Sequence, residues 1–421
     1  MSILVRQATI KDINSPHHNK VKDIFIENGI IKEIADHLER SADSIIQETG
    51  IYISPGWIDI FVTGTDPGYE FKDTLSSTAA SAAKGGFTHL FLTPNTNPVI
   101  QNKATVEYIK SKTLKHPVQL HPLGAVTKNT EGTELTEIYD MKASGAIAFS
   151  DGTKPIQSSG LMIKALQYVS AFNGIILQLP DDRTIAPHGL MNEGIVSTKI
   201  GLPGKPALAE EIMIARDIAL AKYTGSHVHI TGLSLATGVE MIRKAKKEGI
   251  KISCSCTPQH LLFTDEDLID GYNTNLKVNP PLRSATDRAA LISGVKDGTI
   301  DCITTHHTAQ HKDAKVCEFE YAGYGTLGLE SAFGALNNIS LEVDQILTAI
   351  CFNPRDLFMI NGSIKEGSTA DVTLFVPETL GWKHNSGYHS LSSNNAFEQT
   401  MLKGKIVGTI LQHNIYINKN A

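Results

Sequence analysis

The sequence predicts an α/β protein built as a (β/α)8 barrel, with a small β domain formed by both ends of the chain. Short apolar runs alternate with helical stretches through the middle of the chain, a pattern typical of repeated βα units around a parallel sheet. The intervening stretches, such as TLSSTAASAAKGG and ALAEEIMIARDIALAKYTG, are rich in Ala, Leu, Glu and Lys. The two ends instead carry short alternating segments separated by turn residues.

Eight apolar runs are the predicted strands of the barrel. They occupy residues 57–62, 88–93, 118–126, 146–150, 174–179, 227–231, 251–256 and 301–305. Eight strands with helices between them fit a (β/α)8 barrel. An open doubly wound sheet is the alternative on periodicity alone, but no glycine-rich phosphate-binding fingerprint follows the first run.

The terminal segments predict a separate β domain. ILVRQATI and VKDIFIENGIIKEI near the start, and KEGSTADVTLFVP and MLKGKIVGTILQ near the end, alternate as antiparallel strands do. We therefore expect residues 1–54 and 365–421 to form a small β-sandwich-like domain, and residues 55–364 to form the barrel. The polar stretch 378–395 is expected to be irregular.

Composition excludes several classes of protein. A formal net charge of −6 supplies no general attraction for nucleic acid or anionic lipid. The start, MSILVRQATI, has no basic stretch followed by a long apolar run, so we expect neither a signal peptide nor a membrane span. Five scattered cysteines, an odd number, suit a reducing compartment. We expect a cytoplasmic protein, with Cys254 and Cys256 as small core residues.

Several long motifs carry a resemblance to a known family. They are PGWIDI (55–60), DPGYEFKDT (66–74), AAKGGFTHLFLTPNTNPV (82–99), GLPGKPALAEEIMIARD (201–217), TPQHLLFTDEDL (257–268), NPPLRSATDR (279–288), DGTIDCITT (297–305) and GTLGLESAFG (325–334). With these motifs the sequence resembles type I dihydroorotase of the amidohydrolase superfamily. The resemblance covers nearly the whole chain and implies a barrel that hydrolyses a cyclic amide with zinc at the carboxyl ends of its strands.

The metal positions that the resemblance implies are altered in this chain. The family's His-x-His pair, its two further histidines and its strand-8 aspartate fall on Phe61, Thr63, Gln178, Gly232 and His306. The family's bridging aspartate falls on Asp151, which is retained. Catalytic zinc generally needs three protein ligands with N, S or O donors. Phenylalanine has no lone pair and glycine has no side chain, so we expect no metal ligands here and no cofactor.

The substrate positions are half lost as well. A family arginine that clamps the substrate falls on Thr65, and a family histidine falls on Gln310. Asn95 and Asn279 stand where the family uses asparagine against the substrate. Asparagine beside proline also caps turns, so these two side chains are either structural or vestigial ligand contacts.

The remaining histidines offer few replacements for the lost ligands. His227 and His229 precede Gly232 by five and three residues, so we expect them to face the helices and to be structural. His306 and His307 end the eighth strand, where His306 could act as an acid or base near pH 7. We place His121 and His188 near the upper rim of the barrel.

Three functions remain open from the sequence. The leading hypothesis is a non-catalytic, dihydroorotase-like assembly protein, a homodimer by family resemblance, with aspartate carbamoyltransferase or an active dihydroorotase as partner. The second is an active dihydroorotase or related cyclic-amide hydrolase, with zinc and a rearranged site built from Asp151, His306 and His307. The third is a sensor that binds a pyrimidine-like ring through Asn95 and Asn279.

Overall fold

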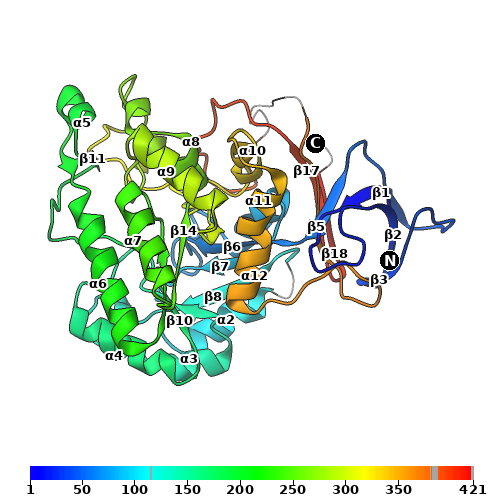
Figure 1. Ribbon diagram of the computed structural model, residues 1–421, viewed down its shortest axis with the longest axis horizontal. Helices are drawn as coiled ribbons and strands as arrows, with labels where there is room; N and C mark the ends of the chain where they lie inside the picture. The colour runs from blue at the N-terminus through cyan, green and yellow to red at the C-terminus, as the bar shows by residue number, and fades with distance from the viewer. Residues whose placement is uncertain (114–115, 380, 382–386, 419–421) are drawn as a thin grey trace.

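The computed structural model describes residues 1–113, 116–379, 381 and 387–418, and these residues form two eight-stranded sheets and a small two-stranded one. In Figure 1 a barrel wrapped by helices lies beside a sheet that contains both ends of the chain. Within these described residues, no helix is both long enough and apolar enough to cross a membrane.

The barrel contains the eight predicted strands, and the predicted fold is confirmed. In spatial order they are β6 (Trp57–Val62), β7 (Phe87–Leu92), β8 (Gln119–Gly124), β9 (Ala148–Phe149), β10 (Ile175–Gln178), β13 (His227–Thr231), β14 (Ile252–Cys256) and β15 (Cys302–Ile303). Every neighbouring pair is parallel. Their carboxyl ends therefore meet at one rim, where the chemistry of such barrels is located.

A buried carboxylate joins the first and last strands of the barrel. Asp59, in β6, is fully buried and accepts hydrogen bonds from the Thr305 amide at 2.9 Å and the Thr305 hydroxyl at 2.5 Å. The Thr304 hydroxyl and the Phe61 amide also donate to it. Within the part of the chain that the structure describes, β6 and β15 form no paired ladder. The bonds to Asp59, with a backbone bond from the Thr63 amide to the His307 carbonyl at 2.9 Å, hold the seam. Burial raises the pKa of Asp59, and the threonine hydrogen bonds oppose that rise.

Helices cover the outside of the barrel (Figure 1). They include α1 (Leu75–Lys84), α2 (Lys103–Thr113), α3 (Ile138–Ser144), α4 (Ser159–Ser170), α6 (Leu208–Thr224), α7 (Ala236–Lys247) and α9 (Ala285–Lys296). Thr74 begins α1 as a capping box with Ser77, as the short polar residues before an alanine-rich run predict. The apolar faces of these helices and the outward strand residues, Cys254 and Cys256 among them, form one buried cluster.

His227 and His229 face the inside of the barrel, so the prediction that they face the helices is wrong. Val228 and Ile230 belong instead to the cluster beneath the helices. The two ring nitrogens of His229 lie 2.8 Å from the Ser253 hydroxyl and 3.0 Å from the Ser255 hydroxyl. The prediction rests on the spacing of these histidines from Gly232. Gly232 follows the end of β13 and has φ +75°, so the two-residue alternation of the strand does not extend to it.

The second sheet combines both ends of the chain. Its spatial order is β18 (Asn414–Ile417), β17 (Lys405–Leu411), β16 (Asp371–Val376), β5 (Tyr52–Pro55), β1 (Ser2–Ile10), β2 (Val21–Glu27) and β3 (Ile30–Ala35), with β4 (Ser44–Ile46) paired to β1. The antiparallel pairing of β5 with β16 joins the two terminal segments. In the stretch 378–395, residues 380 and 382–386 lie outside the described part, and the described residues include no helix or extended strand.

His121 lies near the amino end of β8, so its predicted place at the upper rim is wrong. Its ring stacks on His89 with centroids 5.2 Å apart. The Nε2 atom of His89 lies 3.0 Å from the Asp371 carboxylate in β16. Arg355, in α12 (Asn353–Phe358), pairs with the same carboxylate at 2.5 Å. Burial, with the nearby charge of His89, lowers the pKa of His121 to about 3. These residues join the barrel to the terminal sheet.

The seam predicts a large loss of stability when Asp59 is removed. Asp59→Ala leaves two threonine hydroxyls and two amides without their acceptor, so we expect the free energy of unfolding to fall by about 3 kcal/mol or more. Urea denaturation measures this change. Asp140→Ala, at an exposed position of α3, is the matched control and should change stability by no more than about 0.5 kcal/mol. Equal effects of the two substitutions would contradict a structural role for the seam.

Candidate functional site

A large pocket opens at the carboxyl ends of the barrel strands. Its volume is about 700 Å³, and we call it the mouth pocket. Segments that follow β6, β7, β10 and β15 supply most of its wall. The lining includes Phe61, Thr63, Thr65, Lys72, Asn95, Asp181, Arg183, Lys205, Gln259, Asn279, His306 and Gln310. Several positions singled out from the sequence therefore meet in one cavity.

Two aromatic rings in a tilted contact line the mouth pocket. Phe61 and His306 have ring centroids 4.6 Å apart, and the Nε2 atom of His306 lies 2.8 Å from the Thr231 hydroxyl. A Cβ atom at Gly232 would lie only 2.7 Å from the His306 ring. Three positions that the family resemblance assigns to metal ligands are thus packed against one another, and a side chain at residue 232 no longer has room.

The other two altered ligand positions, Thr63 and Gln178, also make structural contacts. The Thr63 hydroxyl lies 2.7 Å from the Thr308 hydroxyl, while the Thr63 amide donates to the His307 carbonyl at 2.9 Å. The Gln178 side chain turns away from the pocket, where its amide donates to the Ile156 carbonyl at 3.2 Å. Gln178 is buried and does not line the mouth pocket.

Asp151 does not face the mouth pocket. Its carboxylate accepts hydrogen bonds from the Val126 and Thr127 amides at 2.9 Å each and from the Thr127 hydroxyl at 2.5 Å. Burial raises the pKa of Asp151 to about 6 against the effect of these bonds. The retained carboxylate therefore stabilises the loop after β8. The structure does not bring it into the pocket with His306, as the rearranged hydrolase site would require.

The two histidines after β15 have different surroundings. His306 is partly buried in the pocket wall, and burial, with the nearby charge of His260, lowers its pKa to about 3. This shift favours the neutral imidazole, and a role for His306 as an acid or base near pH 7 stays a prediction. His307 points into the protein, where its Nδ1 accepts from the Gly328 and Leu329 amides and its Nε2 lies 3.8 Å from Asp73.

Asn95 and Asn279 line the mouth pocket and also make structural bonds. The Asn95 amide donates to the Asp151 carbonyl at 3.0 Å, and its oxygen accepts from the Thr153 amide at 2.9 Å. The Asn279 amide donates to Asp181 at 3.3 Å, and Asp181 pairs with Lys205 at 2.6 Å. His188 lies on an exposed loop beside the pocket.

Comparison with known proteins shows the family. A model described as dihydro-orotase-like matches residues 50–236. The chain is 39% identical to a dihydroorotase of Ruminiclostridium cellulolyticum over 98% of this chain and 97% of that protein. It is 41% identical to a dihydroorotase of Acetivibrio thermocellus over 92% and 95% of the two chains. The chain belongs to the dihydroorotase family.

Solved structures agree on the fold of this dihydroorotase family member. The L-hydantoinase (dihydropyrimidinase) of Arthrobacter aurescens superposes with a TM-score of 0.84 at 22% identity, covering 100% of this chain and 96% of that one. A dihydropyrimidinase from Brevibacillus agri gives 0.82 at 18% identity, covering 99% and 95%. At these identities the likeness shows the amidohydrolase barrel with its separate β domain.

The prediction of no cofactor is contradicted by these relatives. Dihydroorotases and hydantoinases are zinc-dependent amidohydrolases, and this chain is similar to the former over its full length. The residues of this chain nevertheless do not fit the zinc set of the family. Within the described residues, no three His, Cys, Asp or Glu side chains are grouped so that they could hold a metal ion. Of the altered positions only His306 offers an imidazole, and its Nε2 is bonded to Thr231.

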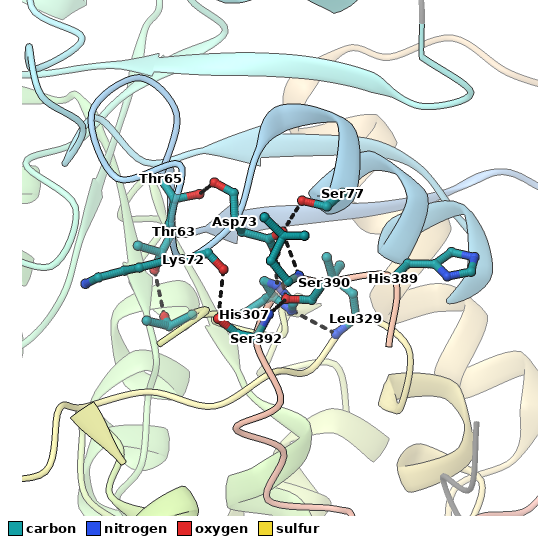
Figure 2. A network of polar contacts seen from close by, with 12 residues as sticks. Thr63, Thr65, Lys72, Asp73, Ser77, His307, Leu329, His389, Ser390 and Ser392 are labelled. Carbon is teal, nitrogen blue, oxygen red and sulfur yellow. Dashed lines mark hydrogen bonds and ion pairs between the residues drawn. The ribbon is translucent and has the colours of Figure 1, made fainter. Parts of the chain in front are cut away.

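The sequence did not indicate a polar cluster beside the mouth pocket, shown in Figure 2. Asp73 is almost completely buried and accepts from Ser77 and, at 2.8 Å, from the Ser390 hydroxyl. The Thr65 hydroxyl donates to the Asp73 carbonyl at 2.7 Å, so the residue at the position of the lost arginine now fastens this loop. Burial alone would raise the pKa of Asp73, but its hydrogen bonds and the charge of His307 lower it overall.

Gln259 is a pocket residue that the sequence did not indicate. It follows β14 in the TPQHL motif, and its amide donates to the Thr305 carbonyl at 3.1 Å. Its Oε1 atom is buried without a hydrogen-bond partner among the described residues. Its place just after the seventh strand of the barrel was the available signal, because side chains at that end of a barrel face the site.

The contact between Gly232 and His306 predicts a coupled effect of substitution. Gly232→Ala places a Cβ against the ring at a positive φ, so we expect a loss of about 2–4 kcal/mol in the free energy of unfolding. In a His306→Ala background the same change should cost only about 1 kcal/mol, from the backbone conformation alone. Chemical denaturation of the unsubstituted chain, the two single variants and the double variant gives the coupling free energy between residues 232 and 306. Additive effects would show that the two residues do not share this space.

The Asp73 cluster predicts a pH dependence of stability. Because the folded protein lowers the pKa of Asp73 below its ordinary value of 3.8, this carboxylate stabilises the fold above pH 3.8. That contribution disappears as the pH falls through the lower folded value. Asp73→Asn should therefore destabilise the protein by about 1–3 kcal/mol at pH 7 and by progressively less below pH 3.8. Denaturation at several pH values tests this, with Asp140→Asn as control; a pH-independent difference would contradict it.

Proposed function

We propose that this chain is a dihydroorotase-like protein of pyrimidine biosynthesis that keeps the ligand pocket of its family without performing the hydrolysis. One observation carries the proposal. The ring of His306 is packed between Phe61 and Gly232, at the place where the family resemblance puts metal ligands. Hydrolysis of a cyclic amide needs an activated water and a polarised carbonyl. The side chains at these positions are bonded to each other and are not arranged to supply either.

The intact scaffold supports a role in assembly. The barrel, its seam and the terminal sheet are all maintained around the altered centre. We propose a cytoplasmic homodimer that holds a partner enzyme of the same pathway, with aspartate carbamoyltransferase or an active dihydroorotase as the partner. Co-purification and light scattering at native concentration test this proposal. A chain that stays monomeric and never binds either enzyme would contradict it.

A second candidate is an active dihydroorotase or related cyclic-amide hydrolase, which acts on the C–N bond of dihydroorotate. It is favoured by the full-length similarity to proteins named dihydroorotase, at 39% and 41% identity. The mouth pocket, at about 700 Å³, also has a volume typical of small-molecule sites. A sensor of pyrimidine-like rings that uses Asn95 and Asn279 would need the same pocket.

Turnover separates the first proposal from the second. The full chain, purified without chelator and assayed with dihydroorotate with and without added zinc, should be at least about 1,000-fold slower than the relative from Ruminiclostridium cellulolyticum, a barrier difference of about 4 kcal/mol. Zinc content is measured on the same samples. Near-stoichiometric zinc together with turnover that His306→Ala abolishes would overturn the proposal in favour of an active hydrolase.

A further inference from the structure

Lys72 is a cation in the wall of the mouth pocket with no anion beside it. Its side chain is half-buried, and its amino group lies 5.5 Å from the Tyr69 ring centroid and 6.0 Å from that of Phe71. Among the residues that the structure describes, no carboxylate lies within ion-pair distance of it. Burial lowers the pKa of the Lys72 ammonium, as expected when no protein anion offsets the loss of hydration.

The backbone holds Lys72 in place. Its amide donates to the Tyr69 carbonyl at 2.9 Å, and its own carbonyl accepts from the Ser392 hydroxyl at 2.7 Å. The next residue, Asp73, anchors the buried cluster described above. In Figure 2 the Lys72 amino group points away from that cluster. The backbone that carries this charge is therefore held by its neighbours before any ligand arrives.

The other charged residues of the pocket leave this charge uncompensated. The lining contains the cations Lys72, Arg183 and Lys205 but one carboxylate, Asp181. Asp181 already pairs with Lys205 at 2.6 Å, and Arg183 is exposed and donates to the Thr153 carbonyl. A partly enclosed cavity with excess positive charge favours an anionic ligand.

We propose that Lys72 binds the carboxylate of a small cyclic amide in the mouth pocket and replaces the arginine clamp that Thr65 has lost. The inference rests on the proposed function, since it assumes that the pocket still binds a ligand. Gln259 lines the same cavity, and its side-chain amide is a suitable polar group for the amide of a small ring. A single ammonium and an amide acceptor together match a monoanionic cyclic amide.

Binding of two probes to the full chain tests this role. Calorimetry compares dihydroorotate with dihydrouracil, which has the same ring without the carboxylate. Lys72→Met should weaken dihydroorotate binding about tenfold or more and leave dihydrouracil binding unchanged. Lys72→Arg, which keeps the charge, should retain most of the affinity. Lys103→Met, which removes an exposed lysine of α2 outside the pocket, is the matched control and should bind like the unsubstituted chain.

Three results would overturn the inference. They are no binding of dihydroorotate by the unsubstituted chain, unchanged affinity in Lys72→Met, and an equal loss of affinity for both probes. Thermal unfolding of each variant without ligand shows whether Lys72→Met remains folded, and if it does not, Lys72→Arg with the two probes carries the test. Turnover would contradict the proposed function while leaving the Lys72 inference intact, because the latter depends on affinity for a carboxylate.

Discussion

The His306 ring and the side chains around it determine what the mouth of this barrel can do. The ring lies against Phe61 on one side, bonds to Thr231, and occupies the space above Gly232. Because the barrel centre is densely packed, none of these residues can change size without affecting the others. Burial also lowers the pKa of the imidazole to about 3, which favours its neutral form.

This interdependence explains why the altered positions form a set. A side chain at residue 232 would overlap His306, and the ring of Phe61 packs against the same side chain. The family's zinc site therefore cannot be recovered at one position alone. The zinc dependence of the relatives and the donor set of this chain disagree, and the disagreement comes from a few side chains at one rim.

The scaffold around the altered centre depends on three buried carboxylates. Asp59 holds the barrel seam, Asp371 joins the barrel to the terminal sheet through His89 and Arg355, and Asp73 ties the segment near Ser390 to the first loop. A buried carboxylate is costly unless it is paired or hydrogen-bonded, and each of these three has such partners. They keep the loops of the mouth pocket in place, including the loop that carries Lys72.

The sequence by itself determined the eight strands, the union of the two ends in one sheet and the family, because apolar periodicity and long motifs are local signals. It also located the altered positions Phe61, Thr63, Gln178, Gly232 and His306. Only the tertiary structure decided where side chains point. It turned His229 inward, moved His121 to the opposite end of the barrel, kept Asp151 out of the pocket and left Lys72 unpaired. Each of these outcomes depends on contacts between residues far apart in the chain, which periodicity does not encode.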